Sequence, residues 1–358
     1  MPATDFRLQK LLGISAPILC APMATVAGGS LAAQVTLGGG FGFIGAALFT
    51  LDQLAEQLEI ARVELDTEKG LPLRVGAGFI GWVLDEDEKG GEKAIKLTLN
   101  SGVHAVWFAF GDDLYKWIKV VRKYDSDNDR KTLVFVQLAL PDDIQIALRD
   151  WNVDVIVAQG HSRIYLFTKW ANVCFMAVGK EAGGHGFADA PRLKDVVSSV
   201  LSVTPQNDGP ILVGAGGLAT GEQIAEILSL GAAGVVLGTR FCLTPESTYS
   251  EAAKQALIAA NSDASVKSMG FDKVAGYLKW PKGIDGRALR NASLDGYERG
   301  EDIESLRSKY KEAYPRNDTS RTMVWAGAGV GQMHDIKPAK QLVEELYRDC
   351  LAHLKVTG

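Results

Sequence analysis

The sequence is poor in cysteine, and the few cysteines that it has stand far apart. Four of the 358 residues are cysteine, and no two of them form a Cys-x-x-Cys pair; they are Cys20, Cys174, Cys242 and Cys350. This spacing argues against both a zinc site and a disulfide framework. We therefore predict a protein that has no bound metal and works in a reducing compartment.

Long apolar runs, a secretory leader and an excess of basic residues are also missing. No stretch of about 18 apolar residues occurs, and residues 1–5 show no basic segment followed by an apolar one. The formal net charge of -5 at pH 7 does not suit a nucleic-acid binder. We expect a cytoplasmic protein with a small-molecule substrate, no membrane or nucleic-acid partner, and a monomeric or homodimeric assembly.

What the sequence does contain is a regular alternation of short apolar runs with helical segments. Such alternation predicts βα units around a parallel sheet, and eight units predict an α/β fold of the (β/α)8 TIM-barrel type. Most runs are largely apolar, as strands buried on both faces should be. The eight expected strands are residues 18–22, 41–46, 73–78, 105–110, 133–138, 153–159, 211–214 and 234–237.

Toward the C-terminal end this alternation stops. Residues 261–321 are rich in lysine, glycine and aspartate, and an apolar stretch and a last helix follow them. We interpret residues 1–260 and 322–358 as the barrel, and residues 261–321 as a small, mainly helical cap or substrate domain. The length of 358 residues fits a large barrel with such an appendage.

Several expected strands end in glycine-rich turns, and the active sites of barrels lie at these strand ends. The turns after strands seven and eight occupy the usual phosphate position of the fold, and the helix after Thr220 adds the positive end of its dipole. We therefore predict a phosphate site, with simple tight turns as the alternative. The strand ends read Ala21-Pro22-Met23-Ala24, Gln159-Gly160, Gly214-Ala215-Gly216-Gly217 and Gly238-Thr239-Arg240.

Two other motifs have the letters of a binding site without its context. Residues 76–81 match Gly-x-Gly-x-x-Gly, but the acidic stretch 82–91 is not expected to open a helix, so no dinucleotide site is predicted. Residues 125–129 resemble the start of a calcium loop. Arg130 and Val136 stand where that loop needs glycine and glutamate, so we expect a solvated turn.

The glycine-dense segment 179–186 carries a histidine, His185. Glycine lets the main chain approach a flat ligand without a Cβ in the way, and imidazole is the side chain best suited to moving a proton near neutral pH. His185 is therefore the candidate catalytic residue. The plainer alternative is a histidine that is satisfied inside its own loop.

Together these segments resemble the nitronate monooxygenase family, formerly called 2-nitropropane dioxygenases, and in particular its fungal branch. The resemblance covers almost the whole length. It implies a TIM barrel that binds FMN non-covalently and oxidises alkyl nitronates with O2 to an aldehyde or ketone plus nitrite, with neutral nitroalkanes as a further substrate left open. The segments that carry it are residues 21–24, 38–42, 159–160, 181–185, 214–217 and 237–239.

The resemblance also implies a role for each site residue. His185 would hydrogen-bond the nitro oxygens and abstract the α-proton of neutral nitroalkanes. The flavin ring would be lined by Pro22, Met23 and Ala24 and contacted by Gln159, Gly183 and Gly184. The phosphate of the flavin would be held by Gly216, Gly217, Gly238 and Thr239.

Residues 161–179 depart from the family pattern. In relatives the Gln-Gly motif at 159–160 runs almost directly into the histidine loop, and joining Gly160 to Lys180 restores that spacing. The segment is apolar and aromatic, with neither clear strand alternation nor a clean helical face. We interpret it as an insert in the loop after strand six, and it is either a translated intron or a true lid.

Three rival functions stay open, and two segments carry weaker expectations. The first rival is an FMN-dependent NAD(P)H oxidoreductase of the enoyl-ACP or quinone reductase type. The second is an IMP dehydrogenase type of barrel, although none of the four cysteines lies in a loop that resembles its nucleophile site. The third is an inactive flavin-binding barrel disrupted by residues 161–179. A lysine or arginine of the segment 280–291 is expected to attract an anionic nitronate. Residues 325–331 are expected to return the chain to the barrel mouth.

Overall fold

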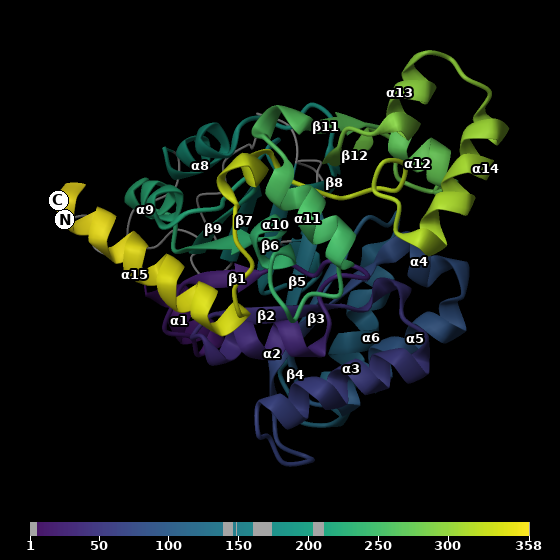
Figure 1. Ribbon diagram of the computed structural model, residues 1–358. Coiled ribbons are helices and arrows are strands. Elements are labelled where there is room, and N and C mark those ends of the chain that lie inside the picture. The colour runs from purple at the N-terminus through teal and green to yellow at the C-terminus, as the bar shows by residue number, and fades with distance from the viewer. Residues whose placement is uncertain (1–5, 139–145, 148, 160–173, 203–210, 358) are drawn as a thin grey trace.

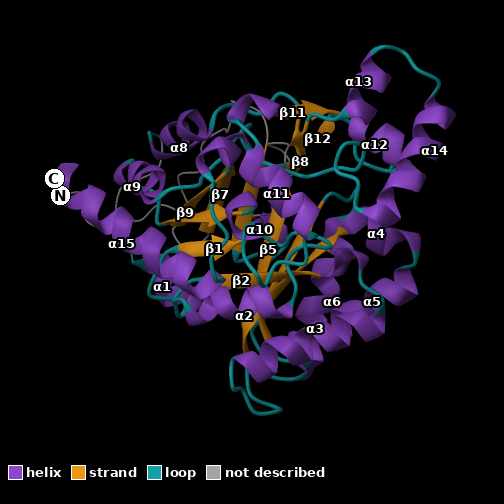
Figure 2. Cartoon of the chain, viewed as in Figure 1, coloured by secondary structure: helices purple, strands orange, loops and turns teal. Residues whose placement is uncertain are grey.

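The computed structural model describes residues 6–138, 146–147, 149–159, 174–202 and 211–357. In these residues nine parallel strands close into a barrel, and a separate three-stranded sheet lies beside it (Figures 1 and 2). In their order around the barrel, the strands are β1 Ile18–Cys20, β10 Gly234–Leu237, β9 Ile211–Ala215, β7 Cys174–Val178, β6 Val155–Gln159, β5 Leu133–Leu138, β4 Val103–Ala109, β3 Leu73–Ile80 and β2 Phe41–Gly45.

Helices surround this barrel, and none of the described helices is long and apolar enough to cross a membrane. The last helix packs against α9 and α2. The helices outside residues 261–321 are α1 Arg7–Leu12, α2 Gly29–Leu37, α3 Leu51–Glu64, α4 Gly81–Glu86, α5 Glu88–Asn100, α6 Leu114–Asp127, α8 Leu193–Leu201, α9 Gly221–Ser229, α10 Thr239–Cys242, α11 Glu251–Ala259 and α15 Ala339–Thr357.

The predicted α/β barrel is confirmed, and each of the eight expected strands lies within two residues of its expected bounds. Within residues 161–179, which we interpret as an insert after strand six, β7 forms a further barrel strand between β6 and β9, and the interpretation as an insert stays a prediction. Met176 and Val178 are buried. A parallel strand covered on both faces shows no polar alternation, so the missing alternation was not an argument against a strand. Residues 161–173 lie outside the described residues.

Aromatic side chains fill the barrel interior. The ring centroids of Phe43 lie 5.2 Å from Phe41, 5.4 Å from Trp107 and 5.1 Å from Phe135, all edge to face. All four residues are buried. The interior is therefore a packed core, which leaves the ends of the strands as the place for a ligand.

The glycines at 76–81 have a packing role. The argument that residues 82–91 do not open a helix, which we used against a dinucleotide site, was wrong. A helix, α4, does open at Gly81. Gly76 and Gly78 instead lie inside β3. A methyl group on Gly76 would lie 2.3 Å from the Phe43 ring, and one on Gly78 would lie 2.3 Å from Pro22 Cβ. These contacts explain the glycines without a dinucleotide.

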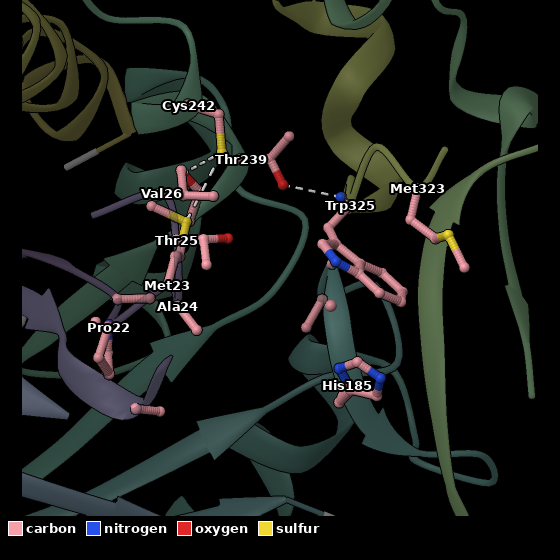
Figure 3. A pocket seen from close by; sticks show the side chains of 18 of the residues that line it. Pro22, Met23, Ala24, Thr25, Val26, His185, Thr239, Cys242, Met323 and Trp325 are labelled. Carbon is pink, nitrogen blue, oxygen red and sulfur yellow. Dashed lines mark hydrogen bonds between the residues drawn. The ribbon is translucent and has the colours of Figure 1, made fainter. Parts of the chain in front are cut away.

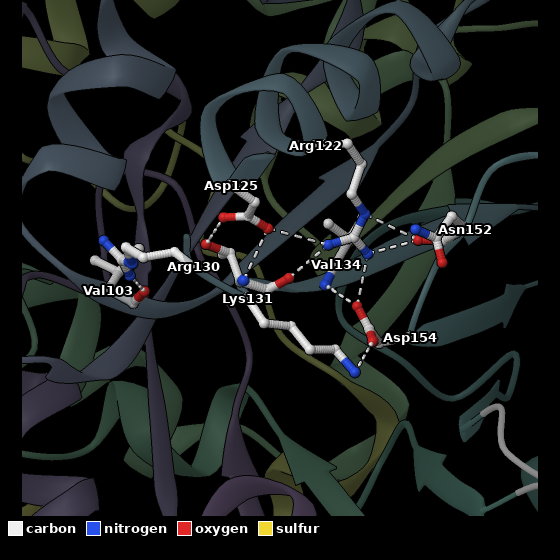
Figure 4. A network of polar contacts seen from close by, with 9 residues as sticks. Val103, Arg122, Asp125, Arg130, Lys131, Val134, Asn152 and Asp154 are labelled. Atoms are coloured by element: carbon white, nitrogen blue, oxygen red, sulfur yellow. Dashed lines mark hydrogen bonds and ion pairs between the residues drawn. The ribbon is translucent and has the colours of Figure 1, made fainter. Parts of the chain in front are cut away.

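The acidic stretch at 125–129 is exposed and turns at residues 128–129, as expected, except at its first residue. Asp125 is buried on α6 and accepts hydrogen bonds from the Thr132 amide at 2.9 Å and hydroxyl at 2.7 Å (Figure 4). Arg122 bridges Asp125 and Asp154, at 3.3 Å and 2.7 Å. Asp154 also accepts from the amide of Val134 at 2.9 Å. The network joins α6 to the amino-terminal ends of β5 and β6, on the far side from the strand ends.

Residues 261–321, which we call the cap segment, form a compact group of strands and helices. Its elements are β11 Ser265–Ser268, α12 Gly270–Ala275, β12 Ile284–Leu289, α13 Ala292–Glu298 and α14 Ile303–Ala313. The strand order in its antiparallel sheet is β11-β12-β8, where β8, Gly184–Phe187, comes from the histidine loop. The candidate catalytic histidine is therefore held by a sheet that it shares with the cap segment.

Candidate active site

A cavity of about 490 Å³ lies at the carboxyl ends of the barrel strands, between these ends and the cap segment (Figure 3). Its volume is within the range of roughly 300–1,000 Å³ that is usual for small-molecule sites. Gln159 ends β6, but its side chain lies outside the described residues. All the other sequence-predicted site residues line the cavity: Pro22, Met23, Ala24, Gly183, Gly184, His185, Gly216, Gly217, Gly238 and Thr239.

The loop after β1 is fixed by close packing on two glycines. A methyl group on Gly45 would lie 2.2 Å from the carbonyl oxygen of Met23, and one on Gly78 would lie 2.3 Å from Pro22 Cβ. Within this loop, Thr25 has a φ of 60°. A non-glycine residue in this left-handed region is strained, and such strain clusters at ligand sites.

Two buried thiols pack near this loop without a reactive role. Cys242 Sγ lies 3.7 Å from Met23 Sδ. Burial raises the pKa of Cys242 to about 12, and burial also raises the pKa of Cys20 well above its ordinary value. Both side chains stay protonated at neutral pH, so neither is a nucleophile.

The turn after β9 lines the cavity with residues 216–218. Gly216 and Gly217 have φ values of 118° and 70°, a conformation that glycine adopts without strain. Among the hydrogen bonds of the described residues, none uses the N–H of Gly216, Gly217 or Leu218. Consecutive amides that are not used within the protein suit an anion such as phosphate.

The helix that follows this turn contributes less than expected, because its start is already capped. Thr220 Oγ1 accepts from the Gln223 amide at 3.3 Å, while Gln223 Oε1 accepts from the amides of Ala219 at 2.7 Å and Thr220 at 3.3 Å. This capping box satisfies the amides of Thr220 and Gln223, whereas no hydrogen bond among the described residues uses the amides of Gly221 and Glu222. The donors available for a phosphate are therefore those of the glycine turn and these two amides.

The segment 325–331 returns to the barrel mouth, as expected. The Gly327 amide donates to Thr239 Oγ1 at 2.9 Å, and the Ala328 amide donates to the Glu181 carbonyl at 2.9 Å. Trp325 is held by Tyr249, whose hydroxyl accepts from the Trp325 amide at 2.9 Å and donates to its carbonyl at 3.2 Å. This segment joins the histidine loop to the turn after β10.

His185 projects from β8 between aromatic rings and a carboxylate. Its ring stacks on Trp280 with centroids 3.5 Å apart and planes at 12°, and the Trp325 ring lies 4.7 Å away at 54°. Its Nε2 lies 2.8 Å from Oδ1 of Asp272 on α12. In the sheet, His185 pairs with Gly286 of β12. The cap segment therefore supplies most of the surroundings of His185.

Sequence reasoning missed the aromatic wall beside His185 and its carboxylate partner. Trp280 contacts Phe110 at 5.2 Å and Trp82 at 5.6 Å between ring centroids, and all three line the cavity. Phe110 directly follows β4 with a φ of 57°, so its place at a strand end was an available signal. Asp272 gave no such signal, because it lies 87 residues from His185 in a segment without strand or helix periodicity.

The cavity lining is uncharged within the described residues, apart from the ionisable histidine: it includes no aspartate, glutamate, lysine or arginine. The expected cations of residues 280–291 turn elsewhere. Arg287 donates to the carbonyls of Lys180 and Ser265, and Arg290 pairs with Asp295 and Glu298. Neither arginine lines the cavity, and the expected attraction of a nitronate by a lysine or arginine of this segment stays a prediction.

The sequence matches a family model and curated proteins of the same name. The model described as Nitronate monooxygenase matches residues 6–349. The chain is 31% identical to the nitronate monooxygenase of Neurospora crassa, over 94% of this chain and 90% of that protein. It is 28% identical to the nitronate monooxygenase npaC of Metarhizium robertsii, over 92% of this chain and 89% of that protein.

Solved structures share the barrel. FabK from Thermotoga maritima superposes with a TM-score of 0.72 at 22% identity, covering 98% of this chain and 97% of that one. The nitroalkane oxidase from Streptomyces ansochromogenes gives a TM-score of 0.71 at 23% identity, covering 98% and 99%. At these identities the likeness supports the fold.

Proposed function

We propose that this protein oxidises alkyl nitronates, with FMN as cofactor and O2 as oxidant. The premise is that the chain belongs to the nitronate monooxygenase family and is therefore an oxidoreductase. The products are a carbonyl compound and nitrite. The observation that carries the proposal is the meeting of the glycine turns, the Pro22–Met23–Ala24 loop and His185 in one cavity.

The residues of the cavity fit FMN. The turn at 216–218 offers three amides without partners among the described residues, which suits a phosphate, and the loop at 22–24 offers an apolar edge for a flat ring. Gly183 packs closely on Gly327, since a methyl group on Gly183 would lie 2.5 Å from the amide nitrogen of Gly327. Bound FMN would supply the electron acceptor for the substrate.

His185 would act on the substrate in two ways. A nitronate is a delocalised anion, and a hydrogen-bond donor fixed beside it stabilises that charge. For a neutral nitroalkane, the same imidazole would take the α-proton and produce the nitronate in the site. The rings of Trp280, Trp82 and Phe110 would exclude water around it, since all three line the cavity.

The uncharged lining favours substrates with no second charge. Moving a carboxylate into a cavity whose described lining has no lysine or arginine to pair with it would cost several kcal/mol or force its protonation. We therefore assign this site to nitronates and nitroalkanes with apolar chains.

An absorbance spectrum of the purified protein, followed by anaerobic addition of ethyl nitronate, tests the proposal. Flavin bands that bleach with nitronate are the expected result. Bands that bleach only with NAD(P)H would replace the proposal with an NAD(P)H oxidoreductase. A colourless protein that FMN cannot reconstitute would contradict both and leave the inactive barrel.

A further inference from the structure

We propose that Asp272 is a positioning residue for His185: its carboxylate holds the imidazole by Nε2–H, so that Nδ1 is the atom that exchanges a proton with the substrate. The inference deepens the proposed function and rests on it for the role of His185 as a base. The pairing of the two side chains is a property of the protein alone, so it is tested separately.

The geometry of the pair defines which nitrogen carries the hydrogen. His185 Nε2 lies 2.8 Å from Asp272 Oδ1, and the side chains are 11% and 0% exposed. An ionised carboxylate only accepts hydrogen bonds, so the neutral ring donates from Nε2. A proton taken from a bound substrate must then arrive at Nδ1.

The carboxylate has little else to interact with. Asp272 Oδ2 is buried and has no hydrogen-bond partner among the described residues. The other titratable groups that act electrostatically on the pair include Asp285, Tyr277 and Tyr310, none of which is a cation. A buried carboxylate with one unpaired oxygen is costly, and such a cost is kept where the group serves a function.

The packing around Asp272 keeps it in place. A methyl group on Gly286 would lie 3.3 Å from Asp272 Oδ2 and 2.5 Å from the Trp325 ring. On the main chain, the Asp272 carbonyl accepts from the amides of Gly276 at 2.8 Å and Tyr277 at 2.9 Å. The carboxylate, the glycine and the Trp325 ring thus form a tight support behind the imidazole.

The tautomer of His185 is the direct readout. The experiment records ¹⁵N chemical shifts of the histidine rings in the FMN-reconstituted protein, which has five histidines. The pair of signals that is missing in His185→Asn is assigned to His185. We expect the wild-type signal of His185 to show the Nε2–H tautomer. In Asp272→Asn and Asp272→Ala, we expect a mixture of the two tautomers.

Asp285→Asn is the matched control, because it removes a nearby carboxylate that makes no hydrogen bond to His185. Its spectrum should keep the Nε2–H tautomer. Near-ultraviolet circular dichroism identifies which of the two Asp272 variants is folded, and the conclusion is drawn from a folded one. An unchanged His185 tautomer in a folded Asp272 variant overturns the inference.

Turnover gives the second readout. The kcat for a neutral nitroalkane should fall roughly 10²-fold or more in Asp272→Asn, by analogy with other carboxylate-oriented histidine bases, whereas nitronate oxidation should change only a few-fold. Equal losses on both substrates would contradict a role in proton transfer. If the wild-type enzyme turns over neither substrate, the proposed function fails, and the tautomer experiment still decides whether Asp272 orients His185.

Discussion

At the scale of single residues, Gly217 shows how narrowly the phosphate turn is specified. A methyl group there would lie 2.6 Å from Glu181 Cβ, on a backbone with a φ of 70°. We expect Gly217→Ala to weaken FMN binding at least about tenfold. The new methyl group would clash with Glu181 and add backbone strain of order 1–2 kcal/mol, and the turn would have to move to relieve both. Fluorescence titration of the apoprotein with FMN measures this.

Gly70→Ala is the control for this substitution. Gly70 has a φ of 90°, and a methyl group there meets nothing within 4 Å. It therefore adds backbone strain without changing the cavity. If both variants weaken FMN binding equally, the effect is a general loss of stability and the turn is not a phosphate site.

His185→Asn separates the two roles proposed for the imidazole. We expect it to abolish turnover of neutral nitroalkanes, because an amide cannot accept the α-proton, and to spare nitronate oxidation in part, because the amide still donates a hydrogen bond. Initial rates of nitrite release from nitroethane and from ethyl nitronate measure the two activities. Full nitroethane activity in this variant would remove His185 from the role of base.

The site was predictable from the sequence where the chain is locally distinctive. The glycine turns stand directly after barrel strands and His185 lies in a glycine-dense segment, and the structure brings them into one cavity. Asp272 and Trp280 come from the cap segment, and their approach to His185 depends on the β8–β12 pairing. Tertiary pairing of this kind leaves no periodic signal in a sequence.

At the scale of elements, Lys267 of β11 makes the cap sheet sensitive to pH. Its Nζ donates to the carbonyl of Phe187, at the end of β8. Burial, together with the nearby Arg287, lowers the pKa of Lys267 to about 8. The unfolded chain holds this proton up to about pH 10.4, so between these values the unfolded state binds more protons and the protein becomes more stable as pH rises.

Lys267→Met should remove this part of the pH dependence. Urea unfolding at pH 7.5 and pH 9.5 measures the free energy of unfolding, and the gain between the two should be smaller in the variant than in the wild type. Lys282→Met, which replaces an exposed lysine of the cap segment, is the control. An equal gain in wild type and Lys267→Met would contradict the lowered pKa.

The barrel strands were easier to predict than the elements beside them. Short apolar runs separated by helices define β1 to β6, β9 and β10, because each such run is covered on both faces. The same rule should have identified β7. The cap strands β11 and β12 were missed because polar and charged residues interrupt their few apolar ones, so neither forms an apolar run.

At the scale of the whole molecule, β7 makes the barrel one strand larger than the predicted one. It lies between β6 and β9 and ends at Val178, which lines the cavity. We expect deletion of residues 161–179 to let β6 pair with β9 and to bring Gln159 to the position of Val178. The deletion variant should fold, and it should retain FMN at least as well as the full chain.

Flavin content after purification compares the deletion variant with the full chain. Sequencing of the transcript shows in addition whether residues 161–179 are encoded in the mature message. A deletion variant that is insoluble or colourless, while the full chain is yellow, would show that β7 is a native strand of the barrel.

The uncharged cavity gives a second prediction at this scale, because barrel and cap segment both line it. We expect kcat/KM for 1-nitrobutane to exceed that for 3-nitropropionate, a molecule of similar length with a carboxylate, at least about tenfold. Oxygen consumption measures both rates, and nitroethane is the reference. Equal kcat/KM values for the two compounds would show that a cationic side chain pairs with the carboxylate of 3-nitropropionate in the site.

The shared sheet also constrains how substrates reach the site. β8 is hydrogen-bonded to β12, and the same strand carries His185. A rigid swing of the cap segment away from the barrel would have to break this ladder and would carry off the partner of His185. Such a swing would therefore dismantle the His185–Asp272 pair each time the cavity opened, so access to the cavity and the integrity of the catalytic framework are coupled.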